Sequence, residues 1–224
     1  MDMLHLSEEQ QNRLLDEIEK HGDLTEADRK VLKVLSKSEF SDIKIGIAQM
    51  LVNDETPEST AILLSMIEDE DDLVRINAID SLCGCQDTNV MKRLMDIAQK
   101  DMNHLVRKYA ILSAVDIAKS REECGNTGIV PFLQQVLKRE IDSGIRLACY
   151  RGLYLFGDKR YLSQLEQGLL EEDYRNRCAA VHILSEIADD KNVEQIRTIL
   201  MNARKKEKIH AVADAIDRAL SEMQ

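Results

Sequence analysis

Residues 71–82 read DDLVRINAIDSL, and two later segments, HLVRKYAILSA from His104 and SGIRLACYRGL from Ser143, repeat the same pattern. In each segment a branched apolar residue precedes an arginine, and apolar residues return three, four and seven positions after it. Offsets of three, four and seven fall on one face of an α-helix. The pattern therefore predicts amphipathic helices that belong to one repeated unit.

Alignment on the basic residue, which we term the anchor, extends the repeat to six units. By subtraction, successive anchors are 31, 32, 39, 31 and 31 residues apart. Four units carry alanine three positions after the anchor, which would let neighbouring helices approach closely. The anchors are Lys44, Arg75, Arg107, Arg146, Arg177 and Lys208.

Asp or Asn stands four residues before four of the anchors. These residue types are preferred N-caps because their side chains accept the free amide hydrogens of the first turn. We expect each anchor cation to pair with the cap acid of its own or the adjacent unit. The first and last units have Phe40 and Arg204 at the cap position. The expected structural ladder comprises Asp71, Arg75, Asn103, Arg107, Asp142, Arg146, Asp173 and Arg177.

Each anchored helix is preceded by another amphipathic segment, so the units are helix pairs. Ahead of the first pair, Ser7 and Gln10 form a predicted capping box and Gly22 is a predicted helix stop. We predict thirteen helices: a capping helix within residues 1–22, and six pairs in a single continuous domain over 23–224. The long spacing from Arg107 to Arg146 places a lengthened loop at 119–128, which is either a neutral insertion or a contact loop.

A two-helix unit of about 31 residues, with D-x-x-V-R opening its second helix, resembles the HEAT repeat family. The residues that carry the resemblance are 71–75, 103–107 and 142–146. They are most similar to the short bacterial, phycobilisome-lyase-like repeats. The resemblance implies an all-α, right-handed α-solenoid of about six antiparallel helix pairs, with the second helices lining a concave face.

Composition restricts the partners that such a protein would bind. Acids outnumber bases 41 to 30, and the formal net charge is −11. Nucleic-acid binding and anionic membranes both favour Lys and Arg, so neither is expected. The first residues lack the pattern of a secretory signal, and the five cysteines are read as reduced thiols. We expect a cytoplasmic protein.

Positions two, five and nine residues after the anchors point away from the predicted core. On the expected concave face, three of them, Tyr109, Leu112 and Leu155, are apolar, which indicates either a contact site or burial against the next repeat. The predicted partner-binding residues are Asn77, Asp80, Tyr109, Leu112, Asp116, Arg151, Leu155, His182 and Glu186.

We expect a non-catalytic scaffold that binds a protein with a basic or mixed surface, without a cofactor. Some proteins that resemble this fold are bilin lyases, which is one alternative. Another is an acidic inhibitor, such as an immunity protein that occludes a basic enzyme. The five histidines lack zinc spacing, and Cys83-Gly84-Cys85 has no second pair. His182 and Glu186 have a spacing that would allow an acid–base pair in principle, but we interpret them as a solvated pair on the helix surface.

Overall fold

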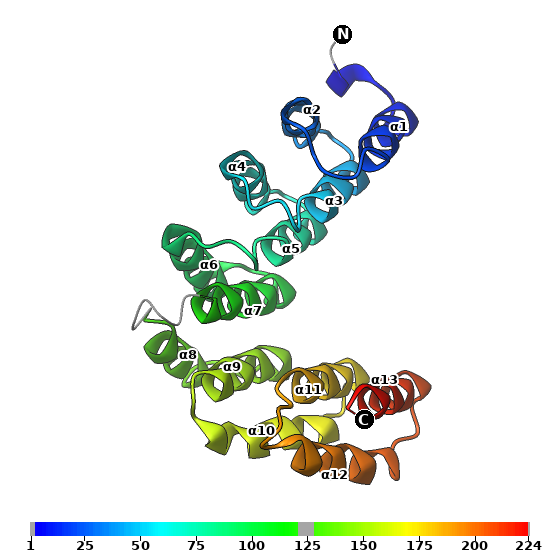
Figure 1. Ribbon diagram of the computed structural model, residues 1–224. Helices are drawn as coiled ribbons and strands as arrows, with labels where there is room; N and C mark the ends of the chain where they lie inside the picture. Colours follow the sequence, from blue (N-terminus) through cyan, green and yellow to red (C-terminus); the bar gives the residue numbers. More distant parts are fainter. Residues whose placement is uncertain (1–2, 121–127, 224) are drawn as a thin grey trace. The chain divides into compact units, whose positions relative to one another are not determined.

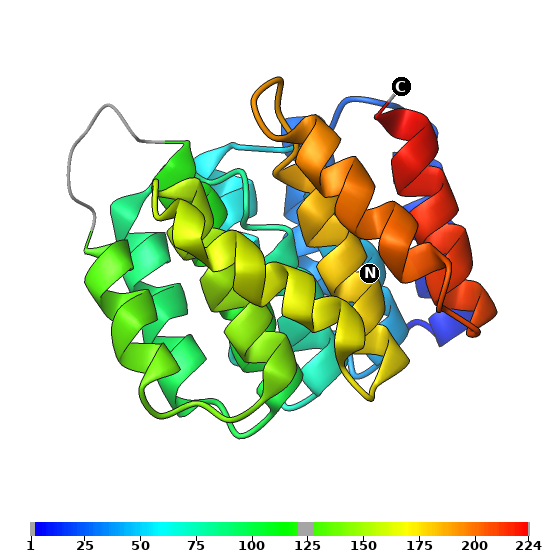
Figure 2. The ribbon, with the colours of Figure 1, turned by 90° about the horizontal axis from the view of Figure 1, so that it is seen from below.

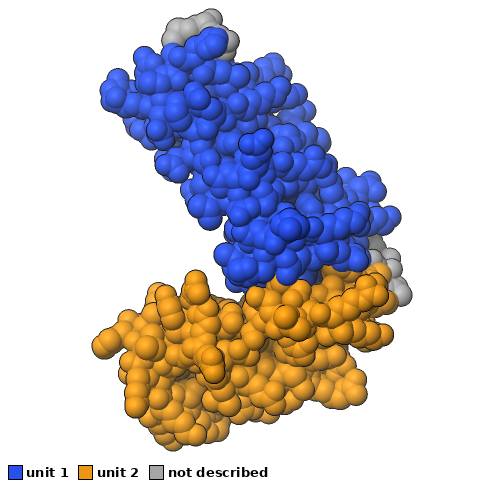
Figure 3. Space-filling view, turned by 180° about the vertical axis from the view of Figure 1, so that it is seen from behind, with its two compact units in different colours: residues 1–127 blue, residues 128–224 orange. Residues whose placement is uncertain are grey.

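The computed structural model describes residues 3–120 and 128–223. The chain divides into two compact units, residues 1–127 and 128–224, which Figure 3 colours separately. Thirteen α-helices and no strand are found among the described residues. Of the predicted loop at 119–128, residues 121–127 lie outside the described part. None of the described helices combines the length and apolar character that crossing a bilayer requires.

The predicted capping helix and six helix pairs are confirmed (Figure 1). The first unit contains η1 (Met3–His5), α1 (Glu8–Glu19), α2 (Glu26–Leu35), α3 (Ser41–Met50), α4 (Pro57–Met66), α5 (Asp72–Asp80), α6 (Thr88–Lys100) and α7 (His104–Lys119). The second contains α8 (Ile129–Leu137), α9 (Ser143–Leu155), η3 (Lys159–Tyr161), α10 (Leu162–Gln167), η4 (Gly168–Leu170), α11 (Tyr174–Glu186), α12 (Val193–Arg204) and α13 (His210–Glu222).

Within each unit the second helices of the pairs form one layer. In the first unit α1, α3, α5 and α7 contact one another in series, and in the second unit α9, α11 and α13 do the same (Figures 1 and 2). Ala78, Ala110 and Ala180, each three residues after an anchor, are fully buried in these layers. A methyl side chain at this position lets adjacent helices pack closely.

The helix starts are capped as the sequence predicts. The cap side chains of Asp71, Asn103, Asp142 and Asp173 each accept a backbone N–H from the first turn, over 2.8–2.9 Å. Ser7 and Gln10 form the expected capping box at α1. Such caps contribute about 1 kcal/mol each and define where the second helices begin.

Three anchor cations bind carboxylates other than the cap acids, so the predicted pairing is wrong at these positions. Each bound carboxylate belongs to a residue two positions before the N-cap of the next second helix. We call these ion pairs rungs. The rungs join Lys44 to Asp69, Arg75 to Asp101 and Arg177 to Glu207, over N–O distances of 2.6, 3.0 and 2.8 Å.

Each rung acid also organises the turn in which it lies. The second Asp101 carboxylate oxygen accepts the backbone N–H of Asn103 at 2.8 Å, and Glu207 accepts that of Ile209 at the same distance. The Arg75 guanidinium, in addition, donates to the carbonyl oxygen of Asp69 at 2.8 Å. The rung between Arg75 and Asp101 therefore fixes both the turn before α5 and the turn before α7. A pair between Arg75 and its own cap acid would hold only the first of these turns.

The last second helix departs from the predicted register. Helix α13 begins at His210 with Ile209 as its N-cap, so Lys208, the expected anchor, precedes the helix. Ala211, expected to be buried, is exposed, whereas the other two predicted positions, Val212 and Ala215, are buried as expected, together with Ala213 and Ile216. The physical reason is that Glu207, held by Arg177, fixes the turn, and the helix starts after it.

Candidate functional site: the surface of the second helices

The structure brings together part of the predicted surface on α5 and α7 of the first unit. Asp80 lies at the end of α5, and Tyr109 and Asp116 lie on α7, which packs beside it. The negative charge of Asp80 raises the pKa of the Tyr109 phenol, after the larger effect of burial. Asn77, one turn before Asp80, receives a hydrogen bond from Gln49 of α3 at 3.4 Å.

This surface is acidic and partly shielded from water. Burial raises the pKa of the Asp80 carboxyl, although the residue still reaches solvent. The pKa of the Cys83 thiol is raised first by burial and then by the charges of Asp116 and Asp80. Two carboxylates therefore lie near Cys83, a residue that the predicted surface did not include, and the Tyr109 phenol lies near one of them, Asp80. We call Asp80, Cys83, Tyr109 and Asp116 the acidic patch.

The three apolar residues of the predicted surface, Tyr109, Leu112 and Leu155, are all partly buried. Tyr109 and Leu112 are half-buried on α7. Leu155 belongs to the second unit, where it packs against the core that includes Val181 and Leu184. Leu155 therefore contributes to packing, whereas Tyr109 keeps an accessible part and adds a polar group to the acidic patch.

On the second unit, the predicted residues Arg151 and Glu186 form an ion pair that connects α9 with α11. Arg151 Nε donates to Glu186 Oε2 at 2.7 Å, and Nη2 donates to Oε1. The guanidinium is buried, whereas the carboxylate is partly exposed. His182 is exposed on α11. Because Arg151 engages both oxygens of Glu186, the spacing of His182 and Glu186 does not yield an acid–base pair.

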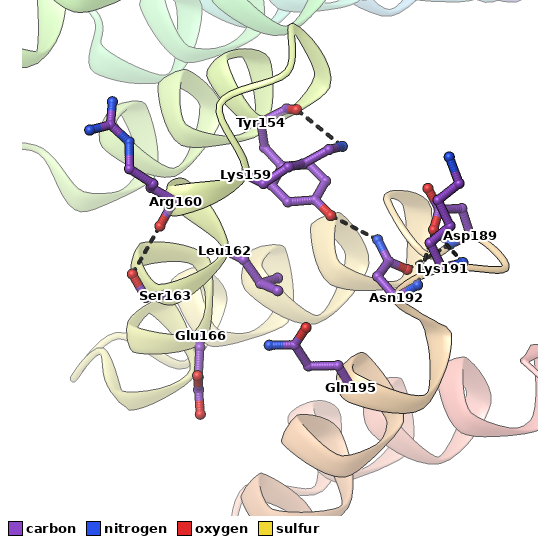
Figure 4. Close-up of a pocket in the computed structure, with 10 residues that line it drawn as sticks. All are labelled: Tyr154, Lys159, Arg160, Leu162, Ser163, Glu166, Asp189, Lys191, Asn192 and Gln195. Atoms are coloured by element: carbon purple, nitrogen blue, oxygen red, sulfur yellow. Dashed lines mark hydrogen bonds between the residues drawn. The ribbon is translucent and has the colours of Figure 1, made fainter.

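The second unit also contains an open pocket of about 460 Å³ (Figure 4). The Lys159 ammonium lies 3.8 Å from the centre of the Tyr154 ring, which gives a cation–π contact. Asn192 is buried and donates to the Tyr154 hydroxyl at 2.8 Å. Arg160 and Lys191 add two further cations to the lining.

Several polar groups in the lining of the pocket are already engaged within the protein. Ser163 donates to the carbonyl oxygen of Arg160 at 3.0 Å (Figure 4), and its hydroxyl also lies 3.0 Å from Gln164 Oε1. Arg160 is engaged by Asp158 through two hydrogen bonds. The remaining cations suit a carboxylate or another anionic group of a ligand.

Burial disfavours the thiolate form of three described cysteines, Cys83, Cys149 and Cys178. Burial raises the pKa of the Cys149 thiol to about 12, and it also raises the pKa of Cys83 and of Cys178. Since the thiolate is the reactive form, these thiols are poorly activated near neutral pH. In residues 3–120 and 128–223, no three His, Cys, Asp or Glu side chains are grouped to hold a metal ion.

Stacked helix pairs whose apolar stripes are buried against their neighbours define an α-solenoid. Residues 29–114 and 91–185 match the model of HEAT repeats, and the chain belongs to the HEAT-repeat family. Among solved structures, it is similar to a chain in the complex of CpcE and CpcF of phycocyanin lyase from Nostoc sp. PCC7120. That match has 16% identity and a TM-score of 0.59 and covers 99% of this chain and 92% of that chain. No curated protein matches the chain.

The comparisons confirm the predicted resemblance to phycobilisome-lyase-like HEAT repeats. At 16% identity, the solved structure shows a shared fold and does not transfer an activity.

Proposed function

We propose that the protein is a non-catalytic cytoplasmic scaffold that holds a partner protein on the surface of its second helices. The acidic patch on α5 and α7 supports this proposal most directly. Asp80 is exposed to solvent there and Tyr109 is half-buried, and partial desolvation raises the pKa of both groups. A partner cation placed beside Asp80 would relieve that cost, because an opposite charge stabilises the ionised carboxylate.

The charge of the chain favours a partner with a basic or mixed surface. A net charge of −11 attracts such a surface over long range and speeds its association. The same charge disfavours nucleic acids and anionic membranes as partners. Tyr109 supplies a rigid aromatic contact of the kind that often dominates binding energy.

Affinity purification from the native host, followed by mass spectrometry, tests the proposal. The Asp80→Lys variant reverses the charge of the patch, and Asp16→Lys makes the same change on an exposed position of α1. We expect one partner to be captured by the wild type and by Asp16→Lys, and to be lost from Asp80→Lys. Full retention of that partner by a folded Asp80→Lys protein would remove the acidic patch from the binding surface.

A bilin-lyase-like role is the second candidate. Two observations favour it: the similarity to a CpcE–CpcF complex chain extends over 99% of this chain, and the pocket of Figure 4 carries Lys159, Arg160 and Lys191. Since Arg160 is engaged by Asp158, Lys159 and Lys191 are the cations that could bind the carboxylates of a linear tetrapyrrole. The raised pKa values of Cys83, Cys149 and Cys178 do not favour covalent attachment at those thiols.

Incubation with a bilin, followed by absorbance measurement, separates the two candidates. A saturable visible band that weakens in a Lys159→Gln/Lys191→Gln variant would favour the lyase-like role. A spectrum equal to the sum of the bilin and the protein would leave the scaffold role as the better account.

A further inference from the structure

Exposed large apolar side chains concentrate at the starts of the second helices. Nine such side chains occur among the described residues, and seven of them lie between three positions before an N-cap and two positions after it. Only Val52 and Met201 lie elsewhere. The seven are Leu73, Met102, Leu105, Ile141, Leu170, Tyr174 and Ile209.

Local folding does not account for this exposure. An apolar residue just before an N-cap often packs against the fourth helical residue, in a hydrophobic staple. Met102 occupies the first of these positions in α7, but the fourth helical residue is Arg107, and Met102 is 95% exposed. Leu73 is 57% exposed. These side chains therefore add nothing to the core and remain available for a contact.

In the first unit, a hydrogen bond joins the two helix starts that carry these residues. Asn103 Nδ2 donates to Asp72 Oδ2 at 2.5 Å, which connects the start of α7 to the start of α5. Leu73 follows Asp72 in the chain, and Met102 precedes Asn103, so both lie beside this bond. The amide of Leu105 is fixed by Asn103 Oδ1 at 2.8 Å. We call residues 68–73 and 100–105 the turn edge.

The charge around these apolar residues is mainly negative, and the two exposed cations nearby, Lys100 and Arg93, are each paired with an acid, Asp96 and Glu68. Residues 68–73 contain five carboxylates and no base. The cations that pair with them from the core side, Lys44 and Arg75, have side chains only 11% and 13% exposed. Glu70 is exposed, and the Asp72 side chain is 48% exposed. A partner approaching from solvent therefore meets carboxylates beside Leu73 and Met102.

We propose that the turn edge binds a basic amphipathic segment of a partner protein. Its apolar side chains would cover Leu73, Met102 and Leu105, and its Lys or Arg residues would pair with Glu70 and Asp72. Burial of apolar area supplies the affinity, and charge complementarity sets the choice of a basic segment. The turn edge is a different surface from the acidic patch, so this inference does not depend on the proposed function.

A fluorescent amphipathic peptide of about 18 residues, built from Leu and Lys at helical spacing, serves as the probe. A second peptide with Glu in place of Lys has the same apolar face. We expect saturable anisotropy with the Lys peptide alone, weakening as salt is raised. In a protein with ¹³C-labelled Met methyl groups, the Met102 resonance should shift during the titration.

Two double variants locate the binding surface. Met102→Ser/Leu105→Ser should lower the affinity for the Lys peptide by about tenfold or more. Val52→Ser/Met201→Ser removes two exposed apolar side chains away from the helix starts and should leave the affinity unchanged. All four positions are exposed, so both variants should melt near the wild-type temperature.

Equal binding by the Met102→Ser/Leu105→Ser variant, equal binding of the Glu peptide, or an unmoved Met102 resonance would each overturn the proposal. Sedimentation of the protein alone provides a further arm. Self-association that this variant abolishes would assign the turn edge to a second copy of the chain instead. The Asp80→Lys variant should keep its affinity for the Lys peptide, so the acidic patch and the turn edge are tested independently.

Discussion

Arg75 joins two successive helix pairs through Asp101. Its Nε atom lies 3.0 Å from one carboxylate oxygen of Asp101, and the other oxygen accepts the backbone N–H of Asn103 at 2.8 Å. Both side chains are only 13% exposed, so solvent screens this pair weakly. The arginine of one repeat thereby holds the turn that begins the second helix of the next.

Replacement of Arg75 by alanine should destabilise the first unit by about 2–4 kcal/mol, because it leaves the Asp101 carboxylate with less compensation in a poorly solvated place. Urea-induced unfolding of the intact chain measures the change. Arg13→Ala is the control, since Arg13 and Glu9 form an ion pair on α1 with both side chains at least 70% exposed. That pair should contribute less than about 1 kcal/mol. Equal losses in the two variants would show that the rung is not structural.

The Arg177–Glu207 rung should make stability depend on pH. The hydrogen bond that the Glu207 carboxylate accepts from Arg177 is the main cause that lowers the pKa of Glu207 from its usual value of 4.5. A carboxyl with a lowered folded pKa stabilises the protein above 4.5, and this contribution is lost as pH falls through the folded value. Glu207→Gln should therefore be less stable than the wild type at pH 7, by about 1–3 kcal/mol, and converge with it in acid.

Thermal melts from pH 3 to 8 measure this convergence. Glu222→Gln, an exposed change near the end of α13, is the matched control and should follow the wild type throughout. A stability difference for Glu207→Gln that stays constant with pH would contradict the ionic account of the rung.

Gly168 has no room for a larger side chain. A Cβ atom there would lie 2.6 Å from Leu147 Cδ2 and 3.0 Å from the Cβ of Ala180. Both neighbours belong to the buried core of the second unit, so Gly168→Ala should cost about 1–3 kcal/mol through overpacking. In a Leu147→Ala background the same change should be neutral or favourable. A double-mutant cycle in urea checks this reversal, and an unchanged cost would place the strain elsewhere.

Helix α13 lacks the side-chain cap that the other described second helices of the unit possess. Its N-cap is Ile209, which is 44% exposed and has an extended backbone. Ile209→Ser should supply the missing acceptor and raise the melting temperature, for a gain of about 0.5–1 kcal/mol. Asp173→Ala, which removes the cap of α11, should have the opposite effect. A lower melting temperature for Ile209→Ser would mean that Ile209 packs more than its exposure indicates.

The number of helices and their caps could be predicted from the sequence because both depend on short-range patterns. Apolar spacing identifies the helices, and Asp71 or Asn103 marks where one starts. The start of α13 was predicted incorrectly because this helix has no cap acid to mark it. Lys208 is a basic residue at the expected spacing, but it lies before the helix.

The rung acids and the surface pairs escaped prediction because they connect residues far apart in the chain. Arg75 and Asp101 are 26 residues apart, and Arg151 and Glu186 are 35 apart. The apolar periodicity of a helix indicates which of its faces is buried. It does not indicate which residues of the next helix pair contact that helix. An acid two positions before each cap was a usable signal, since Asp69, Asp101 and Glu207 all occupy that position.

Since Lys44–Asp69 and Arg75–Asp101 use equivalent positions in consecutive pairs, one junction is interchangeable with the next. A genetic duplication that copies a whole helix pair also copies the cation that binds the next pair and the acid that binds the cation of the preceding pair. An array of helix pairs that share this ion pair can gain or lose a pair during evolution without a new interface between pairs.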